Sequence, residues 1–293
     1  MVKLALITKF GAMTNFVVPI DFSEDSIKGL EWAILFSQKQ RVSITMVYVI
    51  SNSSNFQASV MDLEQKYAEA HFTKLLKEFG PKLANDSQLT YVVSKGKIYQ
   101  EVVDLVNAEE DAVVSASTHG ASGFEELFIG SNALKIIAAT DQPVFTLRTE
   151  VPRDIKKIVV PIKLHPDTRQ KAPAVAEIAK IFDAEVHLVS ISSSKNERDL
   201  QQLESYSKQV ERYLATQRVR SVQKDLSGES LPNLINNYCE AVDADLIAIM
   251  SSAIDKWNVL LGSFAQQMVK STKLPLLNIT PNEKHIAEDF GSH

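Results

Sequence analysis

Short apolar segments alternate along the chain with longer segments whose apolar residues recur every three or four positions. The first, NFVVPI at 15–20, is a continuous apolar run bounded by turn-forming residues. This pattern is typical of a strand buried on both faces of a parallel sheet. The next segment carries an apolar stripe at helical spacing, formed by Ile27, Leu30 and Ile34. Ser23, just before this stripe, is a good N-cap, so a helix is expected to follow the strand directly.

The rest of the first half repeats this alternation. Further strands are predicted at 42–50, 89–94, 111–117 and 143–148, and further helices at 58–79, around 98–106 and from Ser131 onward. Gly80 and Pro81 end the second helix, since neither residue continues a helix well. Regular alternation of this kind predicts an α/β fold, a doubly wound, Rossmann-like parallel sheet with helices on both faces. The expected strand order is 3-2-1-4-5.

The second half of the chain repeats the first. FVVPID at 16–21 recurs as IVVPIK at 158–163 with an offset of 142 residues, and GSNALKIIAATDQPVFTL at 130–147 recurs as GSFAQQMVKSTKLPLLNI at 262–279 with an offset of 132 residues. Internal similarity at a fixed offset indicates repeated structural units. We therefore expect two copies of one domain, domain 1 at 13–149 and domain 2 at 154–281.

Composition narrows the class of protein. Apolar residues make up 45% of the 293 residues and charged residues 23%, which is typical of a globular domain protein. The net charge of −5 and the lack of a basic run argue against nucleic-acid binding. No segment approaches the ~20 apolar residues that span a bilayer, so no membrane association is expected. Cys239 is the single cysteine, which excludes an internal disulfide and favours a cytoplasmic location. A buried, apolar environment is expected for its side chain.

A ligand site is predicted where the first and fourth strands end. Ligands of open parallel sheets bind beyond the carboxyl ends of the strands, at the point where the strand order reverses. Asp21 follows the first strand and Gly120 follows the fourth. Gly120 allows close approach of the backbone to a ligand, and the helix start at Gly130 and Ser131 offers N–H donors to phosphate. Asp21 could instead form a turn before Ser23. The nucleotide site is the favoured interpretation, because these features converge in one place.

With these residues the chain resembles the tandem universal stress proteins over about 14–280. The nucleotide motif of that family is a glycine, two residues, a glycine, nine residues, and then glycine with serine or threonine. The resemblance implies that ATP or a related adenine nucleotide, with or without Mg²⁺, binds in domain 1. The site residues it implies are Pro19, Ile20, Asp21, Val49, Ser117, Gly120, Gly130, Ser131 and Asn132. Val49 corresponds to the residue whose backbone contacts the adenine.

The chain departs from the family motif in both halves. Ser117 stands where the first glycine is expected, which adds a side chain at a point of close approach. In domain 2, Lys163 replaces the aspartate, Ile249 and Ser252 replace the first two glycines, and only the final Gly-Ser pair at 262–263 remains. The domain 2 site is therefore expected to be degenerate, with its Gly-Ser pair kept for the geometry of a helix start.

The sequence favours binding over catalysis. It has no P-loop, no G-x-G-x-x-G, no nucleophile elbow and no paired His-x-x-x-His. His119 lies in the candidate loop, but no motif places a nucleophile or a carboxylate beside it. The leading hypothesis is a non-catalytic stress-response protein that binds an adenine nucleotide in domain 1. The alternative is a nucleotide-free interaction module in which both sites have decayed, and a weak ATPase comes third.

The fifth strand of each domain is expected to lie at a sheet edge. Proteins pair or cover apolar edge strands, because exposed edges aggregate. Single-domain members of the family that this chain resembles dimerise through that edge. We therefore expect 143–148 and 275–280 to associate across a pseudo-two-fold axis, which makes the chain an internal pseudo-dimer. Assembly of two chains into a homodimer is a further possibility that no single feature encodes.

Overall fold

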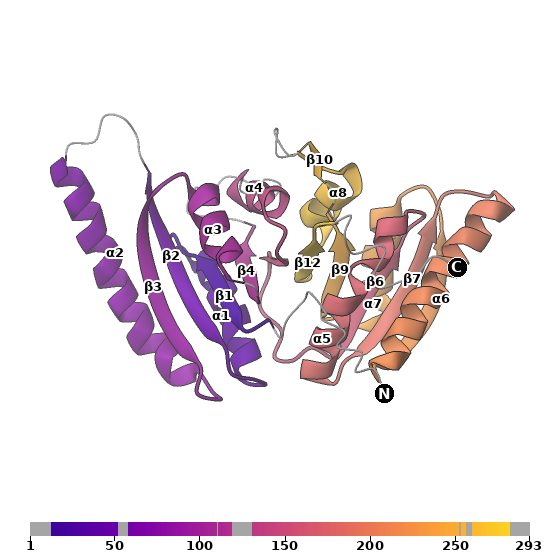
Figure 1. The fold of residues 1–293 in the computed structure, drawn as a ribbon, viewed down its shortest axis with the longest axis horizontal. Coiled ribbons are helices and arrows are strands. Elements are labelled where there is room, and N and C mark those ends of the chain that lie inside the picture. Colours follow the sequence, from indigo (N-terminus) through magenta and orange to yellow (C-terminus); the bar gives the residue numbers. More distant parts are fainter. Residues whose placement is uncertain are drawn as a thin grey trace, which may run out of the picture.

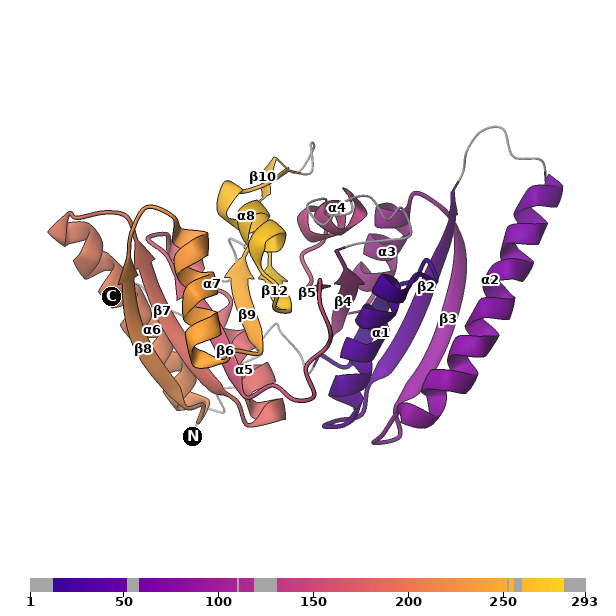
Figure 2. The same cartoon turned by 180° about the vertical axis from the view of Figure 1, so that it is seen from behind.

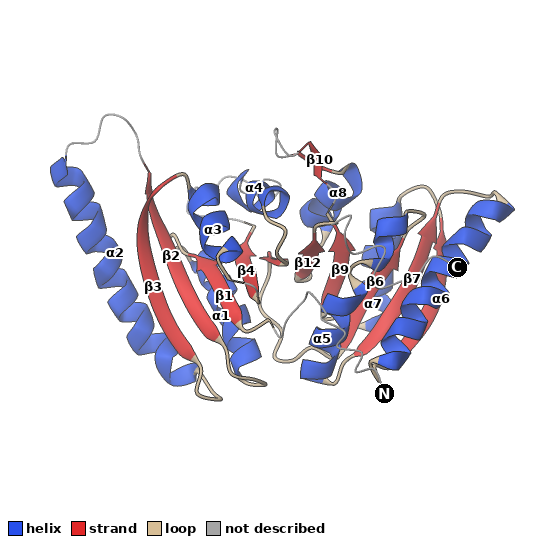
Figure 3. Ribbon diagram, viewed as in Figure 1, coloured by secondary structure: helices blue, strands red, loops and turns tan. Residues whose placement is uncertain are grey.

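The computed structural model describes residues 13–51, 58–109, 111–118, 131–251, 253–255 and 260–281. Ten strands form one continuous sheet in the order β3-β2-β1-β4-β5-β12-β9-β6-β7-β8. Helices cover both faces of this sheet, with α2 and α6 toward its two outer ends (Figure 1). Figure 2 shows the same arrangement from behind, and Figure 3 shows the alternation of helices and strands.

The described residues of the first half form five strands and four α-helices. The strands are β1 (Asn15–Pro19), β2 (Ser43–Ser51), β3 (Gln88–Gly96), β4 (Ala112–Ser117) and β5 (Val144–Leu147). The helices are α1 (Glu24–Ser37), α2 (Ala58–Phe79), α3 (Ile98–Asn107) and α4 (Ser131–Ala139), with a 3₁₀ turn η1 (Gly80–Lys82) after α2. These elements agree with the predicted ones to within one or two residues at most ends.

The second half repeats this series and adds a small hairpin. Its main strands are β6 (Lys157–Ile162), β7 (Glu185–Ser192), β8 (Ser221–Ser227), β9 (Leu246–Met250) and β12 (Leu276–Ile279). Its helices are η2 (Pro166–Arg169), α5 (Ala172–Phe182), α6 (Glu197–Thr216), α7 (Leu231–Val242) and α8 (Ser263–Ser271). The antiparallel hairpin β10 (Ala253–Asp255) and β11 (Leu260–Leu261) lies outside the main sheet.

The predicted topology is confirmed in both halves. β1 pairs in parallel with β2 and β4, and the equivalent strand β6 pairs in parallel with β7 and β9. Each half therefore has the order 3-2-1-4-5. Two features were not predicted: the β10–β11 hairpin, and the division of the first helix of the second half into η2 and α5.

The two halves join through their fifth strands. β5 and β12 pair antiparallel, with Phe145 opposite Leu277 at the centre of the register. These two residues are equivalent in the repeat, because 132 positions separate them. A pseudo-two-fold axis therefore passes between them, as the sequence predicted. The pairing removes both apolar edges and continues the sheet across the whole chain.

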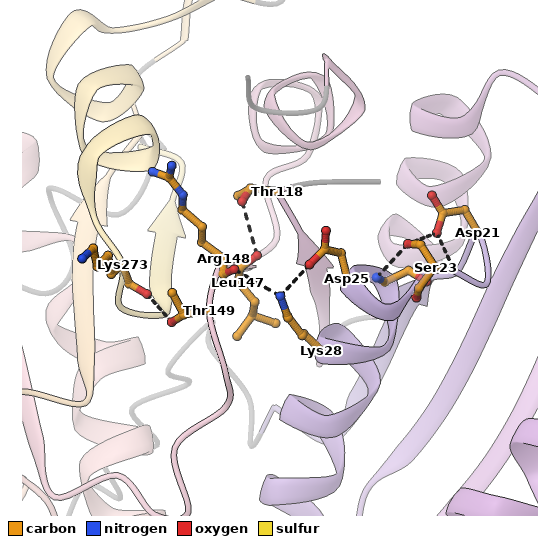
Figure 4. Close-up of polar contacts among 10 residues, drawn as sticks. Asp21, Ser23, Asp25, Lys28, Thr118, Leu147, Arg148, Thr149 and Lys273 are labelled. Atoms are coloured by element: carbon orange, nitrogen blue, oxygen red, sulfur yellow. Dashed lines mark hydrogen bonds and ion pairs between the residues drawn. The ribbon is translucent and has the colours of Figure 1, made fainter. Parts of the chain in front are cut away.

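Side chains reinforce the junction on both sides of the strand pair. Asn278 is 1% exposed, and its amide Nδ2 donates to the Val144 carbonyl at 3.1 Å and to Thr146 Oγ1 at 3.2 Å. Beyond the strands, Thr149 Oγ1 donates to the Lys273 carbonyl at 2.6 Å (Figure 4). Buried polar groups are costly when unpaired, so these bonds favour this one register.

Each face of the sheet has its own apolar core. One face packs under α1, α2, α5 and α6, and its rings cross the junction, where Phe36 meets Phe182 edge to face at 4.9 Å between centroids. The other packs under α3, α4, α7 and α8 and includes Cys239. Burial raises the pKa of the Cys239 thiol to about 12, as expected for a small apolar side chain. None of the described helices combines the length and apolarity needed to cross a membrane.

Candidate functional site

A pocket of about 240 Å³ lies at the carboxyl ends of β1, β2 and β4, beside the start of α4. Six of the nine predicted site residues line it: Pro19, Ile20, Asp21, Val49, Ser117 and Asn132. They come from four separate segments of the sequence, which the parallel sheet brings together at the point where the strand order reverses. Ser131 is the first residue of α4, whereas Gly120 and Gly130 lie outside the described residues.

Asp21 supports the turn that leads from β1 into α1. Its Oδ1 accepts hydrogen bonds from the Ser23 backbone N–H at 3.0 Å and from Ser23 Oγ at 2.5 Å (Figure 4). Ser23 Oγ in turn accepts from the Ser26 N–H at 3.2 Å, which is the predicted N-cap of α1. The turn-forming role considered for Asp21 is therefore real, and the same residue also lines the pocket.

Aromatic packing shapes one side of this pocket. Tyr48 lines it beside Val49, and Phe22 stacks on the Tyr48 ring with 5.0 Å between centroids. Phe22 has a left-handed backbone with φ of 64°, which is uncommon for an aromatic residue. Its ring is also held edge to face by Phe72 at 5.1 Å. Desolvation by burial is the main cause that raises the pKa of the Tyr48 phenol.

The sequence did not predict that Tyr48 lines the pocket or that Phe22 packs against Tyr48. Alternation along β2 puts Tyr48 next to Val49 but on the other face of the strand, so that pattern alone does not place both beside one ligand. The sequence feature that came closest to indicating this packing is Phe22, the aromatic residue directly after Asp21. Ring packing from the distant helix α2 holds this turn, and such packing is not visible in local periodicity.

The equivalent pocket of domain 2 has a different chemistry. It measures about 190 Å³, and five of its lining residues match lining residues of the first pocket through the two offsets: Pro161, Lys163, Thr168, Ile249 and Phe264. Lys163 and Phe264 stand where domain 1 has Asp21 and Asn132. The Lys163 ammonium lies over the Phe264 ring at 4.3 Å from its centroid, a cation–π contact. A lysine–aromatic pair thus replaces a carboxylate and an amide.

Metal-ligating side chains do not gather in the described parts of the chain. No group of three or more His, Cys, Asp or Glu residues there is arranged to hold a metal ion. His119 and Ser252 lie outside the described residues.

Comparison with known proteins agrees with the resemblance seen in the sequence. The profile of the Universal stress protein family matches the chain twice, at residues 13–148 and 154–279. A comparison with curated proteins gives no significant match. Among solved structures, a universal stress protein from Archaeoglobus fulgidus DSM 4304 superposes with a TM-score of 0.74 and 16% identity, over 93% of this chain and 98% of that one. A putative universal stress protein from Pseudomonas aeruginosa UCBPP-PA14 gives a TM-score of 0.63 and 15% identity, over 94% and 98%. At sequence identities of 15–16%, these two superpositions show a shared fold.

Proposed function

Because this chain belongs to the universal stress protein family and carries two copies of its domain, we propose that it is a stress-response protein whose domain 1 binds an adenine nucleotide. ATP or a close relative is the proposed ligand. The observation that carries the proposal is the meeting of six predicted residues, from four separate segments, around one pocket.

The chemistry of the pocket suits the base and ribose of a nucleotide. Pro19, Ile20 and Val49 provide an apolar wall against which a planar base can pack. The Asp21 carboxylate offers an acceptor for ribose hydroxyls or for N–H groups of the base. The volume of about 240 Å³ suits this part of the ligand better than a whole nucleotide.

The start of α4 provides the proposed phosphate position. Its first N–H groups lack partners within the helix, and the helix dipole favours negative charge there. Asn132, in the first turn of α4, lines the pocket. A Mg²⁺ ion can accompany the phosphates while keeping most of its water ligands, so it needs no dedicated cluster of carboxylates.

Binding without turnover is the proposed activity. Hydrolysis of a nucleotide needs a positioned base or metal site, and the sequence carries no motif that is typical of such a site. We therefore expect bound ATP to remain intact. Steady release of phosphate by the purified chain over many turnovers would contradict this part of the proposal.

Exchange of equivalent residues tests the nucleotide site. Asn132→Phe introduces the residue that domain 2 has at this position and fills the pocket beside α4. Titration calorimetry with ATP and Mg²⁺ is expected to show one site per chain, with affinity reduced about tenfold or more in this variant, or about 1.4 kcal/mol. Phe264→Asn, the matched control in domain 2, is expected to leave ATP binding unchanged.

Two results would overturn the proposal. One is equal weakening of ATP binding by Asn132→Phe and Phe264→Asn. The other is the absence of binding by ATP, ADP and AMP to the folded wild-type chain, which would favour the nucleotide-free interaction module. Mass spectrometry of small molecules released from freshly purified protein identifies a ligand that is carried through purification.

A further inference from the structure

Lys171 is a buried cation in domain 2 without an ionic partner among the described residues. Its side chain is only 1% exposed. The ammonium Nζ donates to the Thr168 carbonyl at 2.6 Å and to Thr168 Oγ1 at 3.1 Å, and both acceptors are neutral. Burial of an ammonium group is costly unless a counter-charge compensates for the lost hydration. In its protonated form Lys171 therefore carries a charge that no described carboxylate pairs with.

Lys171 is also one of the residues that line a cavity. Lys171 lines the pocket of about 190 Å³ described above, together with Lys163 from the end of β6. Ile249 and Met250 from β9 and Phe264 from α8 provide apolar walls. In such surroundings a charge–charge attraction is stronger than in water. A small anion in this pocket would therefore interact strongly with both lysines.

One carboxylate also lines the pocket, but it already has partners. Asp167 Oδ2 lies 3.3 Å from His165 Nδ1, and Asp167 Oδ1 accepts from the Gln170 amide at 3.1 Å. Two lysines and one aspartate therefore line the pocket, and His165 is the remaining titratable residue in its lining. The balance of charge around the cavity is positive.

We infer that the Lys163–Lys171 pocket of domain 2 binds a small oxyanion, either phosphate or the carboxylate of a small molecule. The volume of about 190 Å³ is below that of pockets that hold drug-sized ligands, which argues against a whole nucleotide. This site is distinct from the nucleotide site proposed for domain 1, because it uses other residues and the opposite charge.

Binding is expected to be linked to uptake of a proton. Desolvation, with a smaller contribution from Lys163, lowers the pKa of Lys171 to about 7. An anion beside the amine favours its charged form and raises that pKa again. Affinity therefore falls as the pH rises above about 7, since the free protein must then first take up a proton. Lys163, whose pKa is also lowered by burial, contributes in the same direction.

Titration calorimetry of the full-length chain with inorganic phosphate, and separately with acetate, tests this inference. We expect one site per chain near pH 7, with affinity about tenfold or more weaker near pH 9. Lys171→Met, which keeps the length of the side chain but removes its charge, should abolish binding. Circular dichroism and the melting temperature verify that the variant is folded. Binding of only one of the two anions supports the inference and tells phosphate from carboxylate.

Controls separate this site from the others. Asn132→Phe, in domain 1, should leave the phosphate titration unchanged, and His165→Gln should retain the fall in affinity with pH. The inference is overturned if neither anion binds at concentrations up to about 10 mM, well above a millimolar Kd. It is also overturned if folded Lys171→Met binds like wild type, or if Asn132→Phe abolishes binding. None of these results depends on whether domain 1 binds a nucleotide.

Discussion

The first helix of each domain shows how one fold accommodates two kinds of pocket. In domain 1, α1 is continuous and Gly29 lies close to β4, where an added Cβ would be 2.6 Å from the Ser115 carbonyl oxygen. Ser115 Oγ also donates to the Gly29 carbonyl at 2.8 Å. At the offset of 142 residues, Lys171 takes the position of Gly29 in domain 2. The helix there is divided into η2 and α5, and Lys171 lies directly before α5.

The two domains have kept the same strands, whereas the residues that follow the carboxyl ends of the strands have diverged. Both halves of the main sheet have the same strand order, and their first strands include FVVPI and IVVPI. At the carboxyl edge, however, Asp21 becomes Lys163 and a glycine becomes a buried lysine. The strands determine the core, whereas residues after the strand ends determine the charge of the pocket.

The largest effect is expected from removing the buried charge of domain 2. In buffer without phosphate, Lys171→Met should raise the free energy of unfolding by about 4 kcal/mol near pH 7, because folding lowers the lysine pKa from 10.5 to about 7 and each unit corresponds to about 1.4 kcal/mol. The native pKa of about 7 lies below the unfolded value, so the unfolded chain binds more protons between these values. Wild-type stability therefore rises with pH above about 7, and the advantage of the variant shrinks toward about pH 10.

Urea unfolding at several pH values measures this difference. Lys163→Met is the matched variant, since Lys163 is less buried than Lys171 and its pKa is lowered in the same direction. It should show the same sign with a smaller magnitude. A stability gain that does not change with pH would contradict the assignment of the pH dependence to Lys171.

An effect of similar or smaller size is expected at Gly29 in domain 1. Gly29→Val should destabilise the chain by about 2–3 kcal/mol, because the new side chain meets a backbone oxygen that cannot move away easily. Gly80→Ala is the control, since no atom lies within 4 Å of a Cβ at that position. Thermal and urea unfolding compare the two variants. If Gly29→Val were as stable as Gly80→Ala, α1 would have to be able to move away from β4 to make room for the side chain.

The smallest effects are expected at equivalent positions of the two junction strands. Asn278→Leu should destabilise the chain by about 2 kcal/mol, because it leaves buried partners such as the Val144 carbonyl unpaired. Thr146→Val, at the equivalent position of β5, should cost only about 1 kcal/mol, since it loses fewer bonds. Urea unfolding checks the order of the two values. A larger loss of stability in Thr146→Val than in Asn278→Leu would contradict this prediction.

Much of the fold was predictable because its signals are local or repeated. Continuous apolar runs identified the strands, and the Ser23 cap and the apolar stripe of α1 identified the first helix. The repeat then indicated two domains of the same topology. The antiparallel meeting of β5 and β12 followed from the need to cover two equivalent apolar edges.

The candidate site was predictable only in part. The predicted order of the strands brings Asp21 and Ser117 together, and both line one pocket. The Tyr48–Phe22 pair was missed, because Phe72 of α2 packs against Phe22 and Phe22 in turn stacks on Tyr48. Local periodicity does not show which distant helix packs against a turn.

From the sequence alone one can read the two-domain repeat, the order of the strands and the exchange of Asp21 for Lys163. Only the tertiary structure showed that Lys171 is buried, since a lysine ordinarily extends its ammonium group into water. Ile249 and Phe264, which line the same pocket, come from β9 and α8, many residues further along the chain. A side chain's charge can be read from the sequence. Whether that charge is hydrated or enclosed depends on every element that packs around it.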